Sequence, residues 1–276
     1  MSSRCWTSRA ELIKLRSTRL ALWLLPTALA LVVLLVLVTV PAGQDTSGGL
    51  SLRDTDLLAR VVGVATTAGE VVVLALGILS FTQEFRFGTA TATFLVAPDR
   101  RRVLIAKALA LAVAGLLFSA ATITLDLVLS VLIINARGGA VVWSGELVAV
   151  LAAAVAVMAL YGPIGVAIGA LVRNQIAAVA GALVWLLAVE GFLVTLLPAI
   201  GRWMPGGATA GLLQEGRAAT THGALLPAWA GGLVLLGYAT VIGLLASALS
   251  LAKGPHLSAG PRMRLTRQAT LEPWLA

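Results

Sequence analysis

Six long apolar stretches divide the chain, and short polar or basic segments separate them. The stretches cover residues 21–40, 57–82, 103–134, 147–172, 176–200 and 227–252. A helix needs about 20 mostly apolar residues to cross a bilayer, and each stretch meets that length. The runs are continuous and rich in Ala, Leu and Val, without the short alternating segments of a membrane β-barrel. We therefore expect an all-α integral membrane protein with six transmembrane helices, the first of which is too long for the apolar core of a signal peptide.

Composition and charge agree with this expectation. The 276 residues are 59% hydrophobic and only 12% charged, far from the balance of a soluble domain. Fifteen of the 20 Lys and Arg residues lie on one side of the expected spans, and this bias predicts that both termini are cytoplasmic. The formal charge of +8 is then a topology signal, and we expect no nucleic-acid partner. The Ala, Leu, Val and Arg content is typical of a high-GC bacterium, and therefore indicates the plasma membrane.

We expect residues 1–276 to form a single transmembrane domain with two cytoplasmic ends. Residues 1–20 mix aliphatic and basic side chains, a composition that suits a short helix in the membrane interface. Residues 253–276 form a basic tail interrupted by prolines. The longest external connection covers 201–226, where we expect a break at 205–207 and short helices within 208–219.

The sequence carries no recognisable catalytic or metal-binding pattern. One cysteine and two widely separated histidines provide no metal-ligand spacing. Phosphate-binding loops, zinc-protease motifs and serine-hydrolase motifs are absent from the sequence. We expect no cofactor in this chain, no metal and no enzymatic activity of its own. If transport by this protein uses ATP, the nucleotide binds to another chain.

The segment between the second and third apolar stretches is unusual for a loop, because it mixes aromatic and aliphatic side chains with many charges. Gly88 permits a sharp bend, Pro98 ends a helix and Asp99 can cap the next one. This pattern predicts a short cytoplasmic helix held between two spans, which could transmit force from a cytoplasmic partner to both. A surface helix lying on the lipid within a basic cluster would explain the same composition.

The same segment resembles the first cytoplasmic loop of the type-2 permeases of ATP-binding-cassette (ABC) transporters. The residues that carry the resemblance are Glu84, Arg86, Gly88, Thr89, Pro98, Arg102 and Lys107. The six-span layout, the basic helix before the first span and the long last external loop are also similar to that family. The resemblance implies a permease that forms a homodimer or heterodimer and pairs with separate ATPase subunits, which bind the ATP. It also implies that the ATPase contact involves the residues Glu84, Arg86, Gly88, Thr89 and Pro98, and that the substrate is a drug, a lipid or another exported compound.

Three acidic residues, Glu70, Asp126 and Glu190, fall within apolar stretches. A charge at the centre of a bilayer costs about 2.5–3.5 kcal/mol on insertion scales, so each acid should face protein or water. Asp126 shares a helical face with Ser119, Thr122 and Ser130, and Glu70 shares one with Thr66 and other small or polar residues. Glu190 has no comparable polar company in the sequence.

These three acids are candidates for a translocation path that favours cationic or amphipathic compounds. Alternatively, they fix helix packing by pairing with Arg60 or by bonding to Ser and Thr side chains. Gly165 and Gly169 form a G-x-x-x-G pair, which predicts close helix packing; a gating kink near Pro163 is the alternative.

Two further functions remain open at this point. A proton-coupled secondary transporter would use Glu70 or Asp126 as a proton relay. A membrane scaffold without transport activity would anchor a cytoplasmic partner to the lipid bilayer.

Overall fold

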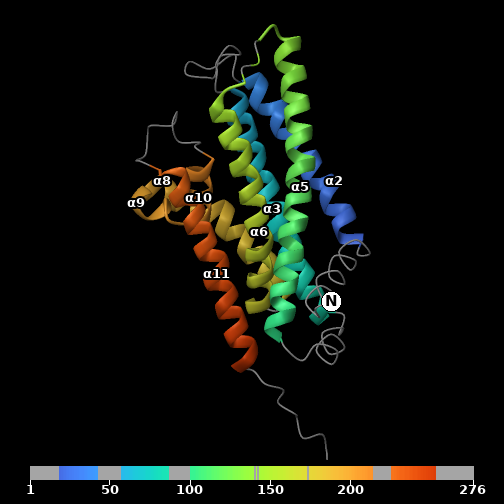
Figure 1. The fold of residues 1–276 in the computed structure, drawn as a ribbon, viewed down its shortest axis with the longest axis vertical. Helices are drawn as coiled ribbons and strands as arrows, with labels where there is room; N and C mark the ends of the chain where they lie inside the picture. The colour runs from blue at the N-terminus through green and yellow to red at the C-terminus, as the bar shows by residue number, and fades with distance from the viewer. Residues whose placement is uncertain are drawn as a thin grey trace, which may run out of the picture.

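The computed structural model describes residues 19–42, 57–86, 100–139, 141, 143–172, 174–213 and 225–252, and all regular structure among them is helical (Figure 1). Five helical stretches are long and apolar enough to cross a membrane: Leu57–Glu84, Arg101–Ala136, Gly145–Val172, Gln175–Leu196 and Ala228–Ala248. A shorter apolar stretch, Trp23–Thr39, lies near the N-terminus. The chain is therefore a multi-span helical membrane protein, and the expected fold class is confirmed at that level.

Helices that follow predicted apolar stretches form the bundle in Figure 1, and the chain reverses direction from each of the first four to the next, whereas the last one runs parallel to the fourth. They are α2 (Arg19–Ala42), α3 (Leu57–Arg86), α5 (Arg100–Ala136), α6 (Gly145–Val172) and α11 (Ala228–Ala252). The end of α3, the start of α5 and the end of α11 lie at the same, lower end of the bundle. That arrangement agrees with the placement of the basic segments on one side, while the orientation in the membrane stays a prediction.

Helices α3, α5 and α6 pack closely because glycines lie at their crossings. A Cβ added to Gly165 of α6 would lie 3.0 Å from the Cα of Gly77 in α3 and still closer to the carbonyl oxygen of Leu74. A Cβ added to Gly169 would lie 2.9 Å from the carbonyl oxygen of Ile78. Small residues at membrane-helix crossings allow such approaches. The predicted packing role of Gly165 and Gly169 is confirmed.

The fifth apolar stretch is one helical rod with a change of geometry inside it. It consists of α7 (Gln175–Val184), a π-helical turn η1 (Trp185–Val189) and α8 (Glu190–Leu196). The side chain of Asn174 caps its start by accepting hydrogen bonds from the N–H groups of Ile176 and Ala177. The predicted span 176–200 is present but ends four residues earlier, at Leu196. Leu197 leaves the helical region, since the residue before a proline disfavours that conformation.

Two short helices follow, α9 (Pro198–Gly201) and α10 (Pro205–Leu212), beside the upper end of α11 in Figure 1. The predicted break at 205–207 was wrong: Pro205 is the first residue of α10, a position where its fixed φ and missing N–H are tolerated. Gly207 lies within this helix, directly against the carbonyl oxygen of Gly201. Gly207 therefore allows the two short helices to pack closely and does not break the chain.

Large apolar side chains are exposed on the outer faces of the rod 175–196 and of α11. Examples are Ile176, Leu187 and Phe192 on the rod and Leu244 on α11. Such surfaces are costly in water but suit contact with lipid chains or with another membrane helix. They agree with a protein that spans a bilayer.

Several expectations lie outside the described residues. These are the interfacial helix, of which only residues 19–20 are described, as part of α2; the segment 87–99 with its predicted cytoplasmic helix; and the tail 253–276. They stay predictions.

Candidate functional site

A buried ion pair joins the ends of α3 and α5 that flank the motif segment. The Nζ atom of Lys107 lies 2.9 Å from Oε1 of Glu84, and the two side chains are only 4% and 13% exposed. The same ammonium donates a second hydrogen bond, of 3.0 Å, to the carbonyl oxygen of Ser80. Glu84 and Lys107 are the first and last residues of the motif, so the structure brings its two ends together.

Of the other motif residues, Arg102 is exposed in the first turn of α5. Arg86 is the last residue of α3, and only its backbone is described. Gly88, Thr89 and Pro98 lie outside the described residues. Helix α5 begins at Arg100, directly after the predicted helix stop at Pro98 and cap at Asp99.

The polar face predicted around Asp126 is buried within the bundle. Ser119, Thr122, Asp126 and Ser130 are each at most 2% exposed. Thr122 donates a hydrogen bond to the carbonyl oxygen of Phe118, so its hydroxyl proton is used locally. The helical spacing therefore predicted correctly that these side chains point into the protein.

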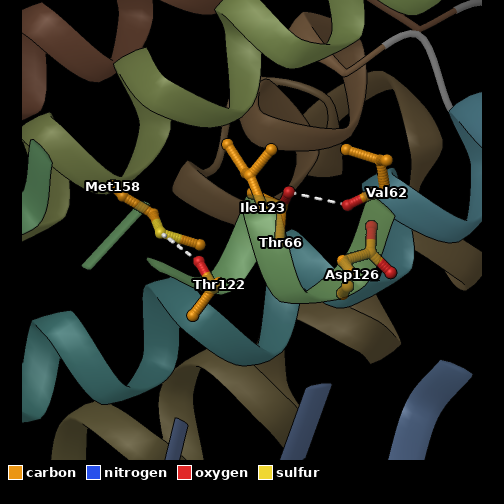
Figure 2. Close-up of a pocket in the computed structure, with 7 residues that line it drawn as sticks. Val62, Thr66, Thr122, Ile123, Asp126 and Met158 are labelled. Carbon is orange, nitrogen blue, oxygen red and sulfur yellow. Dashed lines mark hydrogen bonds between the residues drawn. The ribbon is translucent and has the colours of Figure 1, made fainter. Parts of the chain in front are cut away.

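Asp126 lies in a small pocket between α3, α5 and α6 (Figure 2). The other lining residues are Val62, Ala65, Thr66, Thr122, Ile123 and Met158. One carboxylate oxygen, Oδ1, accepts a long hydrogen bond of 3.4 Å from the Ser130 hydroxyl. The other, Oδ2, is buried and forms no hydrogen bond with any residue that the structure describes. The pocket thus combines apolar walls with one poorly bonded acid.

Glu70 of α3 belongs to a second buried polar group, centred on Tyr161 of α6. The Glu70 carboxyl lies beside the Tyr161 hydroxyl, which is 3.1 Å from the hydroxyl of Thr209 in α10. All three residues are at most 4% exposed. A tyrosine buried in an apolar span needs a hydrogen-bond partner, and α10 provides one here. Glu70 therefore has polar neighbours from a helix other than its own.

Glu190 also has a partner that its own helix does not reveal. Its Oε2 atom accepts a hydrogen bond from the backbone N–H of Gly206, in the first turn of α10. The first N–H groups of a helix have no partner within that helix, and a carboxylate there is favoured by the helix dipole. The residue pattern around Glu190 gave no sign of this partner, because Gly206 is distant in sequence.

Sequence reasoning overlooked Tyr161, Thr209 and Met158. Tyr161 could have been noticed as one of only two tyrosines in the chain, placed within an apolar span. Thr209 and Met158 give no such signal, because a threonine in a loop and a methionine in a span are both ordinary. Their roles come from contacts between helices.

The arrangement includes no cluster of three or more His, Cys, Asp or Glu residues suited to a metal among the residues described. No protein-family model matches this chain, and no curated protein is significantly similar to it. The features that bear on function are therefore the Glu84–Lys107 pair, the Asp126 pocket and the ties that Tyr161 and Glu190 make to α10.

Proposed function

We propose that this chain is the membrane-spanning permease subunit of an ATP-driven ABC exporter, energised by a separate cytoplasmic ATPase. The observation that carries the proposal is the buried pair between Glu84 and Lys107. It joins α3 to α5 at the two ends of the segment that resembles the ATPase-contacting loop of type-2 permeases. The remaining support is the multi-span helical fold, which such a subunit requires.

The pair suggests how movement of the connecting segment reaches the bundle. Lys107 is held by the Glu84 carboxylate and by a backbone carbonyl of α3, so the two helix ends form one unit. A displacement of segment 87–99 by an ATPase would then move α3 and α5 together. Helix α6 would follow, because its glycines pack closely against α3. The proposed permease acts with a second copy or a related chain, and the path for its substrate lies near the buried acids.

The proposal is tested by purifying the tagged full chain from its native membrane in mild detergent and identifying the proteins that co-purify. We expect a phosphate-loop ATPase whose ATP hydrolysis is measurable in the preparation. Glu84→Gln should weaken the coupling of ATP hydrolysis to transport. Glu146→Gln is the matched control. Glu146 lies in the first turn of α6, and α6 starts at the end of the bundle opposite to the Glu84–Lys107 pair, so this substitution should leave coupling unchanged.

A charge exchange sharpens this experiment. Glu84→Lys and Lys107→Glu should each impair coupling, and the double variant should restore part of it, because the ion pair is re-formed with reversed polarity. A chain that purifies without any ATPase contradicts the proposal. If both single variants still couple ATP hydrolysis to transport, the ion pair has no role in coupling.

A proton-coupled secondary transporter is the second candidate, favoured by the buried and poorly bonded carboxylate of Asp126. It predicts transport that persists without ATP and stops when an uncoupler removes the proton gradient. The exporter proposed above predicts the reverse dependence. Flux measured in vesicles that contain the chain, with and without each energy source, separates the two.

A further inference from the structure

The pocket around Asp126 has the chemistry of a site for a positive charge. Asp126 is 1% exposed, and its Oδ2 atom has no hydrogen bond among the described residues. The only hydrogen bond that it accepts from a described residue, from Ser130 to Oδ1, is 3.4 Å long and therefore weak. A buried carboxylate is costly unless it is paired or well hydrogen-bonded, and this one lacks both in the described part of the chain. A cationic group is the ligand that would complete it.

The residues that line the pocket indicate which class of ligand it could bind. The Thr66 hydroxyl donates to the carbonyl oxygen of Val62, and the Thr122 hydroxyl donates to that of Phe118 (Figure 2 shows the first of these bonds). Both hydroxyl protons are thus used within their own helices. The other lining side chains, including Ala65 and Ile123, are apolar. A sugar or an anion would find few donors here, whereas an ammonium on a hydrocarbon chain finds one carboxylate and apolar walls.

Met158 forms the wall of the pocket on α6. Its thioether lies 3.6 Å from the Thr122 hydroxyl, and its methyl end packs directly over Gly69 of α3. Methionine is unbranched and flexible, and it fills irregular gaps that other side chains cannot follow. The pocket is too narrow in this structure to admit a ligand, so the Met158 side chain would have to swing aside for entry.

The position of the pocket connects it to the helix ends discussed above. Thr66 on α3 and Asp126 on α5 each lie about 28 Å along their helices from the Glu84–Lys107 pair. The pocket is therefore built from the same two helices that this pair joins, with α6 as the third wall.

We propose that the Asp126 pocket binds the ammonium group of a cationic amphipathic compound, with Met158 as the movable wall. The inference rests on the proposed function, because it names the class of compound that the exporter would carry. It requires no ATPase for binding itself, so it can be tested on this chain alone.

The test is a binding measurement on the purified full chain in phosphatidylcholine nanodiscs. The probe is monodansylcadaverine, a fluorescent primary amine, compared with its neutral N-acetyl derivative, which has the same fluorophore and chain. Hydrogen bonds to charged groups contribute about 1.5–3 kcal/mol. We therefore expect the chain to bind the amine about tenfold or more tightly than the acetylated probe, after the preference measured with empty nanodiscs is subtracted. A wild-type chain that binds both probes equally would overturn the proposal.

Three substitutions on α5 locate the site. Asp126→Asn keeps the shape of the side chain and removes its charge, and it should abolish the preference for the amine. Ser130→Ala is the matched control, because it removes the neighbouring hydroxyl but keeps the carboxylate, and it should retain the preference. Asp126→Glu, which also keeps the charge, is expected to retain it in part and covers the case in which Asp126→Asn does not fold. If the Asp126→Asn variant still prefers the amine probe, the amine binds at another site and the proposal is refuted.

The outcome is distinguishable from that of the proposed function. Amine preference without any co-purifying ATPase would support the pocket and contradict the exporter. A co-purifying ATPase together with equal binding of both probes would support the exporter and refute this substrate class.

Discussion

The close approach of α3 and α6 makes Gly165→Ala a direct test of the packing described above. The added Cβ would meet three backbone atoms of α3: the carbonyl oxygen of Leu74, the Cα of Gly77 at 3.0 Å and the amide nitrogen of Ile78 at 3.1 Å. Backbone atoms cannot rotate away as the end of a flexible side chain can. The two helices must therefore separate to accept a single methyl group.

The size of the effect follows from these distances. Ordinary contact begins at 3.4 Å, so the Gly77 contact alone requires about 0.4 Å of separation, and the closer Leu74 oxygen requires more. Overpacking of a well-packed interior costs about 1–3 kcal/mol. Alanine is favoured over glycine in a helix by about 1 kcal/mol, which offsets part of this cost. We expect Gly165→Ala to lower the free energy of unfolding by up to about 2 kcal/mol.

The control is Gly243→Ala in α11, where an added Cβ meets no neighbouring atom of the described residues within 4 Å. It gains the helix preference without the clash, so its free energy of unfolding should stay equal or rise by up to about 1 kcal/mol. Both variants are measured by unfolding in mixed micelles with increasing sodium dodecyl sulfate, followed by circular dichroism. If Gly165→Ala were as stable as Gly243→Ala, the close crossing of α3 and α6 would be refuted.

Three other substitutions test the remaining features. Tyr161→Phe removes the hydroxyl bonded to Thr209 and should lower the free energy of unfolding by about 1 kcal/mol, measured as above, and an unchanged value would show that the bond contributes nothing. Glu190→Leu removes the acceptor for the Gly206 N–H and should speed hydrogen exchange at the start of α10, whereas Glu190→Gln, which keeps an acceptor, should not. Gly88→Pro should stop transport without affecting membrane insertion, because it stiffens the expected bend, and normal transport would contradict the coupling role of this segment.

Local pattern was sufficient for most of the fold. Continuous apolar runs predicted the positions of α3, α6 and α11 to within a few residues, because membrane helices must be apolar along their whole length. The spacing of Thr122, Asp126 and Ser130 predicted a buried face, since residues four apart lie on one side of a helix. The error at Leu197 was also local: the proline that follows it was visible in the sequence.

Contacts between distant segments were not predictable in this way. Glu190 meets Gly206 across two helix breaks, and Tyr161 meets Thr209 through a short helix that was expected to begin later. No periodicity relates these pairs, because the chain folds back on itself between them. The sequence therefore showed which acids lie within apolar helices, but it did not show which of them have hydrogen-bond partners.

The acids of the bundle differ in how their charge is compensated, and this difference separates structural roles from a ligand site. Glu84 is paired with an ammonium. Glu190 accepts a hydrogen bond through Oε2 at a helix start, where the dipole favours a negative charge, while its Oε1 forms no hydrogen bond with a described residue. Removing either acid would take an acceptor away from a buried donor, a loss that is sufficient to explain why an acid is present. Asp126 has only a long bond from Ser130, whose hydroxyl could bond equally well to a backbone carbonyl of its own helix. Packing alone therefore gives little reason for a carboxylate at residue 126, and a cation that arrives from outside the chain gives a sufficient one.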